Sequence, residues 1–148
     1  MNAIRRSFAA TIAYMALGAP LSSIAAEDRA AQKPQKERVV IQVSDADPQK
    51  WNLALNNAKN VQTDLGADKT EVEIVAYGPG IGMLKADAIV ANRVEDAVAA
   101  GVKVVACENT MKAQKMTRDE MNRKIDYVGA GVVELMRRQQ QGYAYIRP

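Results

Sequence analysis

The sequence predicts an α/β domain with five strands in a mainly parallel sheet and helices on both faces of that sheet. Short apolar runs rich in Val and Ile alternate along the chain with longer segments of helical spacing, and glycines or prolines mark most of the changes. Such alternation is typical of parallel sheets, because each parallel connection must cross over the sheet. With 148 residues, 48% of them hydrophobic, the chain is long enough for one domain with a real core.

The first 26 residues have the composition of an export signal. Arg5 and Arg6 form a positive start, residues 8–17 are almost wholly apolar, and small residues follow at 23–26. The apolar run is shorter than the roughly 20 residues that a transmembrane helix needs. We expect a cleaved signal peptide at 1–26 and a mature protein in the periplasm, free of the membrane. An uncleaved interfacial anchor is the alternative.

The segment after the signal, residues 27–37, is polar and has no periodicity, so we expect a flexible lead-in. The folded domain is expected at 38–148. Its first strand is predicted at 38–44, which is apolar nearly throughout, as buried parallel strands are. Apolar residues at helical spacing predict a helix at 49–65, which ends before Gly66.

The middle of the chain repeats this order of strand and helix. A second strand is predicted at 71–77, and the glycine-rich residues 78–82 predict a tight loop after it. A second helix is expected at 87–100, and the next residue, Gly101, is expected to end it. The third strand is predicted at 102–106, which carries three valines.

The last third of the chain completes the predicted sheet. Thr117 and Glu120 have the spacing of a capping box, which predicts a short helix. Brief strands are expected at 125–128 and 143–146. A helix at 132–141 separates them, and its basic last turn suits the helix dipole.

Composition excludes several classes of function. The net charge is +3, and loss of the signal leaves 18 Lys and Arg against 17 Asp and Glu. A chain so close to neutral lacks the excess of positive charge that is typical of nucleic-acid-binding proteins. The chain has no histidine, so it contains no Ser-His-Asp triad, no Cys-His dyad and no His-ligated metal site. A single cysteine also excludes an intramolecular disulfide. We predict neither a metal nor any other cofactor.

Cys107, the only cysteine, lies at the end of the third predicted strand. The carboxyl end of a buried parallel strand is where α/β proteins place ligands and reactive groups. A thiol there acts as a nucleophile when amides or a cation stabilise its thiolate. A buried cysteine that serves only as a small apolar residue is the alternative.

Five further residues are candidates for binding a sulfur species or a small anion beside this thiol. Glu108, Asn109 and Thr110 follow the cysteine directly, whereas Gly78 and Gly80 belong to the loop after a neighbouring strand. Asn and Thr are also ordinary helix caps and turn formers, and glycines are ordinary turn residues. A capping role and a binding role can coexist in one residue.

Three parts of the chain resemble the DsrE/DsrF-like family of small sulfur-relay proteins. They are Val75–Ile81 (VAYGPGI), Val105–Met111 (VACENTM), and Ala130–Leu135 (AGVVEL) with Gln140–Ile146 (QQGYAYI). The resemblance covers residues 38–148 in order and implies a three-layer α/β/α fold with a five-stranded, mainly parallel sheet. It also implies a homo-oligomer, commonly a trimer or hexamer. By the same resemblance, Cys107 carries sulfur as a persulfide between a donor and an acceptor protein.

The favoured hypothesis is an exported sulfur-carrier or sulfane-sulfur-binding protein that uses a persulfide on Cys107. It is a carrier more than a turnover enzyme, since no general acid-base pair is visible. The second hypothesis is a non-catalytic oligomeric assembly module with a structural cysteine. The third is a thiol-redox partner that forms an intermolecular disulfide in an oxidising compartment.

Overall fold

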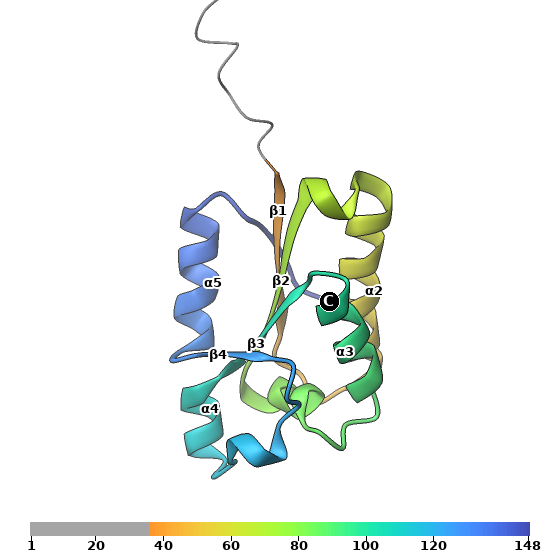
Figure 1. Ribbon diagram of the computed structural model, residues 1–148. Helices are drawn as coiled ribbons and strands as arrows, with labels where there is room; N and C mark the ends of the chain where they lie inside the picture. Colours follow the sequence, from red (N-terminus) through yellow and green to blue (C-terminus); the bar gives the residue numbers. More distant parts are fainter. Residues whose placement is uncertain (1–35) are drawn as a thin grey trace, which may run out of the picture. The chain divides into compact units, whose positions relative to one another are not determined.

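A computed structural model describes residues 36–148; the predicted signal peptide and nearly all of the lead-in lie outside the described residues. The described part contains a five-stranded sheet in the order β4-β3-β2-β1-β5, with all strands parallel (Figure 1). The strands are β1 (Glu37–Val43), β2 (Thr70–Ala76), β3 (Lys103–Cys107), β4 (Asp126–Val128) and β5 (Ala144–Ile146). The predicted α/β fold is confirmed.

Helices connect the strands, because each connection between parallel strands must cross over the sheet. The α-helices are α2 (Pro48–Leu65), α3 (Ala91–Ala99), α4 (Glu108–Ala113) and α5 (Gly131–Gln140). Three short 3-10 helices are η1 (Ala67–Lys69), η2 (Gly78–Leu84) and η3 (Arg118–Glu120). Among residues 36–148, none of the helices has the length and apolarity needed to cross a membrane.

The ends of α2 follow directly from its sequence. Asp47 caps the first turn, because its carboxylate accepts a hydrogen bond from the amide of Gln49 at 2.8 Å, and Pro48 fits the first helical position. Gly66 ends the helix with a φ of 94°, a conformation that favours glycine, and its amide donates to the carbonyl of Gln62.

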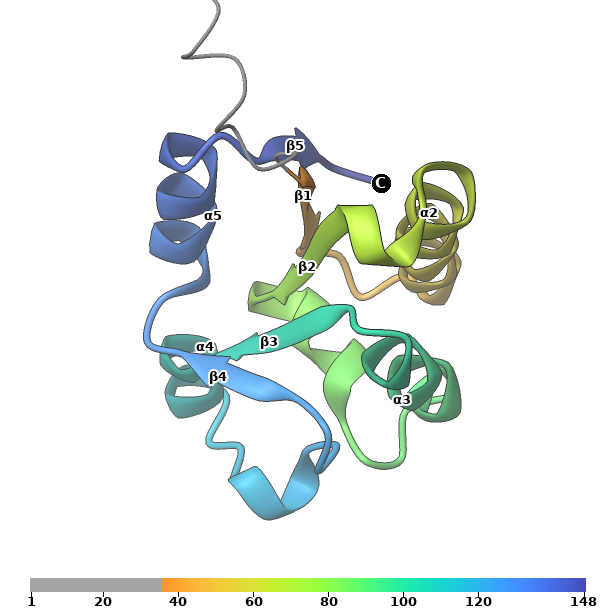
Figure 2. The same cartoon turned by 45° about the horizontal axis from the view of Figure 1, so that its top comes forward.

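Helices α2 and α3 cover one face of the sheet (Figure 2). Side chains of a strand alternate between the two faces, and those on this face are apolar. Ile41, Ile74 and Val104 from the strands pack with Leu55 and Val94 from the helices in a cluster of 21 buried apolar residues. This face therefore holds the main core of the domain.

Helix α5 covers the opposite face of the sheet, which is built differently (Figures 1 and 2). Val40, Val75 and Val105 point to it and form only a small buried cluster with Leu135. Polar strand residues share this face, and one of them, Glu73, is almost fully buried. Helix α4 lies at the carboxyl edge of the sheet, directly after β3, without an intervening loop.

The second predicted helix begins four residues later than its sequence indicates. Residues 86–87 and 89–90 form turns instead, because tertiary contacts hold the backbone just before them. Lys85 forms an isolated bridge with Met121, and the amide of Ala86 donates to the carbonyl of Glu120 at 2.9 Å. The helical pattern at 87–90 is thus overridden by pairing with a distant segment.

The glycine loop predicted at 78–82 is a 3-10 helix that continues to Leu84. Ile81, Met83 and Leu84 are fully buried, so their packing into the main core extends the turn beyond the glycines. The capping box predicted at Thr117 and Glu120 is confirmed, and it opens η3.

Candidate functional site

Cys107 is the last residue of β3, and its side chain is buried at 5% exposure. The alternation along β3 places it on the α5 face, two residues after Val105. Its sulfur contacts the first residue of α5, Gly131, whereas α4 begins at the next residue, Glu108. Three elements therefore meet at this thiol.

Polar groups lie around the sulfur. The amide of Gly131 donates to Sγ at 3.2 Å, and polar groups of Thr110 and Asn109 beside the sulfur also favour its charged form. Burial raises the pKa of the Cys107 thiol, but these groups outweigh burial and lower the pKa below its usual value. The surroundings thus favour the thiolate, which is the nucleophilic form of cysteine.

Thr110 links the thiol to the loop after β2. The amide of Gly78 donates to Thr110 Oγ1 at 2.9 Å, so this oxygen is an acceptor in that bond. The single hydroxyl proton of Thr110 remains for the sulfur. On the other side of the same glycine, the Gln114 amide group donates to the Gly78 carbonyl at 3.2 Å. The structure therefore brings Gly78 and Thr110 together with Cys107.

Asn109 is close to the thiol through its backbone, and its side chain is exposed. The amide of Asn109 also donates to the carbonyl of Gly129 at 3.1 Å, which joins the start of α4 to the turn before α5. Glu108 forms an ion pair with Arg118 at 2.5 Å at the protein surface. Its carboxylate is therefore engaged away from the sulfur.

Gly80 has a packing requirement of its own. A Cβ atom at this position would lie 2.4 Å from the carbonyl oxygen of Val43, at the end of β1. Real Cβ atoms do not approach backbone oxygen so closely, so only glycine allows η2 to pack there. Gly80 thus contacts β1, whereas Gly78 contacts the thiol segment.

Two residues that sequence reasoning did not assign to the site, Gly131 and Tyr77, contribute to it. A Cβ atom at Gly131 would lie 3.0 Å from the Cβ of Tyr77, so glycine lets α5 begin close to β2 and to Cys107. The sequence signals were the pair of glycines at 129 and 131, which predicted a turn, and the place of both residues in segments that resemble the family.

An open groove of about 380 Å³ lies on the α5 face next to the site. It is lined by Gln42, Tyr77, Val132, Leu135, Met136, Gln139, Gln140 and Tyr145. Tyr77 also contacts Gly131, so it connects this groove to the thiol. Val132 and Met136 are 63% and 50% exposed, which leaves apolar surface on α5 at the rim of the groove.

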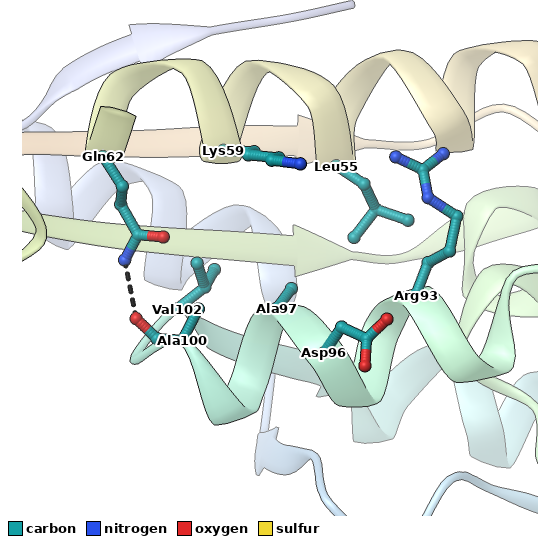
Figure 3. A pocket seen from close by; sticks show the side chains of 8 residues that line it. All are labelled: Leu55, Lys59, Gln62, Arg93, Asp96, Ala97, Ala100 and Val102. Atoms are coloured by element: carbon teal, nitrogen blue, oxygen red, sulfur yellow. Dashed lines mark hydrogen bonds between the residues drawn. The ribbon is translucent and has the colours of Figure 1, made fainter. Parts of the chain in front are cut away.

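A second cavity, of about 250 Å³, lies between α2 and α3 (Figure 3). The Gln62 side chain closes one end by donating to the carbonyl of Ala100 at 2.9 Å, and Leu55 and Val102 form apolar walls. At the other end, Arg93 donates to the side chains of Asn52 and Asn56. This cavity lies on the face of the sheet opposite Cys107.

Comparison with known proteins agrees with the fold. The model of the DsrE/DsrF-like family matches residues 37–148. Protein MTH1491 of Methanobacterium thermoautotrophicum, whose solved structure is described as that of a protein of unknown function, is 34% identical and superimposes with a TM-score of 0.73. The match covers 76% of this chain and 100% of that one. No curated protein matches the chain. The chain belongs to the DsrE/DsrF-like family.

Proposed function

We propose that this protein is a sulfur carrier that takes up sulfane sulfur on Cys107 as a persulfide. Membership of the DsrE/DsrF-like family supports a role related to sulfur relay. The observation that carries the proposal is the 3.2 Å hydrogen bond from the Gly131 amide to the only thiol of the chain, beside polar groups of Thr110 and Asn109 that also lower its pKa. Such donors stabilise a thiolate without histidine or metal, and the sequence contains no histidine.

The transfer step needs no oxidant. The Cys107 thiolate attacks the terminal sulfur of a donor persulfide or polysulfide, and a new bond forms to Sγ. The sulfur–sulfur bond of the donor breaks, and its electron pair leaves with the donor thiolate. The proton of the donor stays on the transferred sulfur, which gives a persulfide on Cys107. Attack by an acceptor thiolate on that outer sulfur reverses the exchange.

The proposal includes export to the periplasm and assembly into a homo-oligomer. Residues 1–26 support export by their composition alone. The exposed apolar residues Val132 and Met136 on α5 support assembly, because contiguous apolar surface beside a groove is common at protein interfaces. Neighbouring subunits would then wall the groove next to the thiol.

A non-catalytic assembly module is the second candidate, and the burial of Cys107 favours it. Native cysteine labelling separates the two candidates, since a carrier thiol reacts in the folded protein and a structural thiol reacts only after unfolding. A disulfide-linked dimer under mild oxidant, seen on a non-reducing gel, would favour the thiol-redox alternative instead.

The direct test is the intact mass of the protein, purified without reductant, before and after exposure to polysulfide. We expect a gain of one sulfur atom that reductant reverses and that Cys107→Ser abolishes. A Met111→Leu variant, altered in the same segment but away from the sulfur chemistry, should gain sulfur like the wild type. A folded protein that gains no sulfur would overturn the proposal.

A further inference from the structure

A cluster of charged side chains lies between the sheet and α5, with Glu73 buried and Lys103 partly exposed. Glu73 on β2 is 2% exposed, and one of its carboxylate oxygens lies 2.6 Å from Nε of Arg138. Arg138 also pairs with Glu134, one turn earlier in α5, at 2.9 Å. Lys103 on β3 lies 3.4 Å from Glu73 and 3.9 Å from Glu134. Two carboxylates and two basic side chains thus lie together between the sheet and α5.

Burial makes these charges costly. Burial raises the pKa of the Glu73 carboxyl, and the positive charges of Lys103 and Arg138 oppose this rise without cancelling it. A buried ion pair is seldom more stabilising than apolar residues of the same volume. What it adds is a strong attraction at one place: Glu73 Oε1 and Arg138 Nε have no hydrogen-bond partner among the described residues, so separating the two side chains would isolate a buried charge.

Helix α5 has little else to fix its position. Gly131 and Leu135 are its only buried residues, and Val132 and Met136 point to solvent. Its far end is held by Arg138, whose guanidinium also lies 5.2 Å from the ring centroid of Tyr143. The charged cluster is therefore the main electrostatic contact between α5 and the sheet.

The same helix supplies the amide that contacts the thiol. Gly131 begins α5, and Glu134 and Arg138 follow about one and two turns later. A helix moves as a rigid unit over this length, so the contact at Arg138 fixes where the Gly131 amide lies.

We propose that Glu73 and Arg138 are positioning residues for Cys107, which orient α5 so that the amide of Gly131 stays against the sulfur. Neither residue touches the thiol. The proposal rests on the proposed function, because the position of the Gly131 amide affects activity only if the Cys107 thiol reacts. Its geometry depends only on the ion cluster and on the 3.2 Å contact between Gly131 and Sγ.

The test is the pH dependence of Cys107 alkylation in the folded protein. Arg138→Met should raise the midpoint of this pH dependence by about one pKa unit. The alkylation rate at neutral pH should then fall about tenfold. Arg137→Met, which removes an exposed charge from the same helix, should leave the midpoint unchanged. A folded Arg138→Met protein with the wild-type midpoint would overturn the proposal.

A double variant, Glu73→Leu with Arg138→Met, separates position from stability. Apolar replacement of both partners removes the orienting contact without leaving a buried unpaired charge, so it also serves if Arg138→Met fails to fold. We expect a stable protein with a raised midpoint, and a wild-type midpoint in this variant would contradict the proposal.

The amide resonance of Gly131 gives a second readout that does not need a reactive thiol. Its chemical shift should differ from that of the wild type in Arg138→Met and in Cys107→Ser, and should equal the wild-type value in Arg137→Met. A thiol that reacts only after unfolding would remove the proposed function, and this resonance would still decide the role of Arg138.

Discussion

The face of the sheet under α2 and α3 belongs to a cluster of 21 buried apolar residues, whereas the face under α5 has a cluster of four and a group of charged side chains. The same strands contribute to both faces, since Ile74 points one way and its neighbours Glu73 and Val75 point the other. The first face accounts for most of the hydrophobic stabilisation. The second face holds Cys107 and the groups that contact it.

The difference indicates how the fold divides its tasks. An apolar core tolerates exchange among hydrophobic side chains of similar volume, so it specifies position loosely. Charged and hydrogen-bonded contacts specify distance and direction. A thiol that needs an amide at 3.2 Å is accordingly found on the face with the directional contacts.

The largest expected contrast is between two leucines of equal burial, Leu55 on α2 and Leu135 on α5, each 4% exposed. Leu55→Ala should lower the free energy of unfolding by about 3 to 4 kcal/mol, because the surrounding core cannot close the cavity. Leu135→Ala should lower the free energy of unfolding by less, because α5 can move closer to the sheet and fill part of the cavity. The same substitution should raise the pKa of Cys107, because the start of α5 moves with the helix. Denaturant unfolding and thiol titration measure the two effects. Equal shifts of the thiol pKa in both variants would break the comparison.

The next contrast is between two glycines of η2. Gly80→Ala places a methyl group 2.4 Å from the carbonyl oxygen of Val43 and should cost about 2 to 3 kcal/mol of unfolding free energy. Gly82→Ala meets only the Trp51 ring at 3.4 Å and should change stability by less than about 0.5 kcal/mol. Thermal unfolding of the two proteins side by side checks this, and similar losses would refute the packing argument for Gly80.

A smaller effect is expected from the hydroxyl at Thr110. Thr110→Val removes the donor to the sulfur and should raise the pKa of Cys107, at a cost of about 1.5 kcal/mol to the thiolate. Thr110→Ser keeps the hydroxyl and should titrate like the wild type. Alkylation rates across pH report both variants. A valine variant with the wild-type midpoint would show that the amides alone set the thiol pKa.

The smallest effect is expected at Glu108. Its ion pair with Arg118 is at the surface, where such pairs contribute little. Glu108→Gln should change the unfolding free energy by less than about 0.5 kcal/mol and leave the thiol titration in place. If the variant instead lowered the thiol pKa, the Glu108 carboxylate would have to face the sulfur.

Local sequence patterns predicted the sheet well. The runs at 38–44 and 102–106 differ from β1 and β3 by one residue at each end. Valine-rich strands and helix caps depend on residues close together in the chain, so a single sequence is enough to predict such elements. The start of α3 was wrong by four residues because the contact between Lys85 and Met121 joins segments far apart in the chain.

The surroundings of the thiol show the same limit. Cys107 and Thr110 lie on one short segment and were singled out together. Gly131 is 24 residues from Cys107, and Glu73 meets Arg138 across the sheet. The arginines near the end of α5 were interpreted as partners of the helix dipole, whereas Arg138 pairs with a buried acid on β2. No periodicity or local motif encodes such a pairing.

The most direct test of the account is the pH dependence of Cys107 alkylation in the folded wild-type protein. The hydrogen bond to the sulfur and the polar groups beside it predict a midpoint below that of an unperturbed cysteine. Because the native pKa lies below the unfolded value, the thiolate should also stabilise the fold relative to Cys107→Ala as the pH rises through this window. A thiol that reacts only after unfolding, or a midpoint above the unperturbed value, would contradict the account.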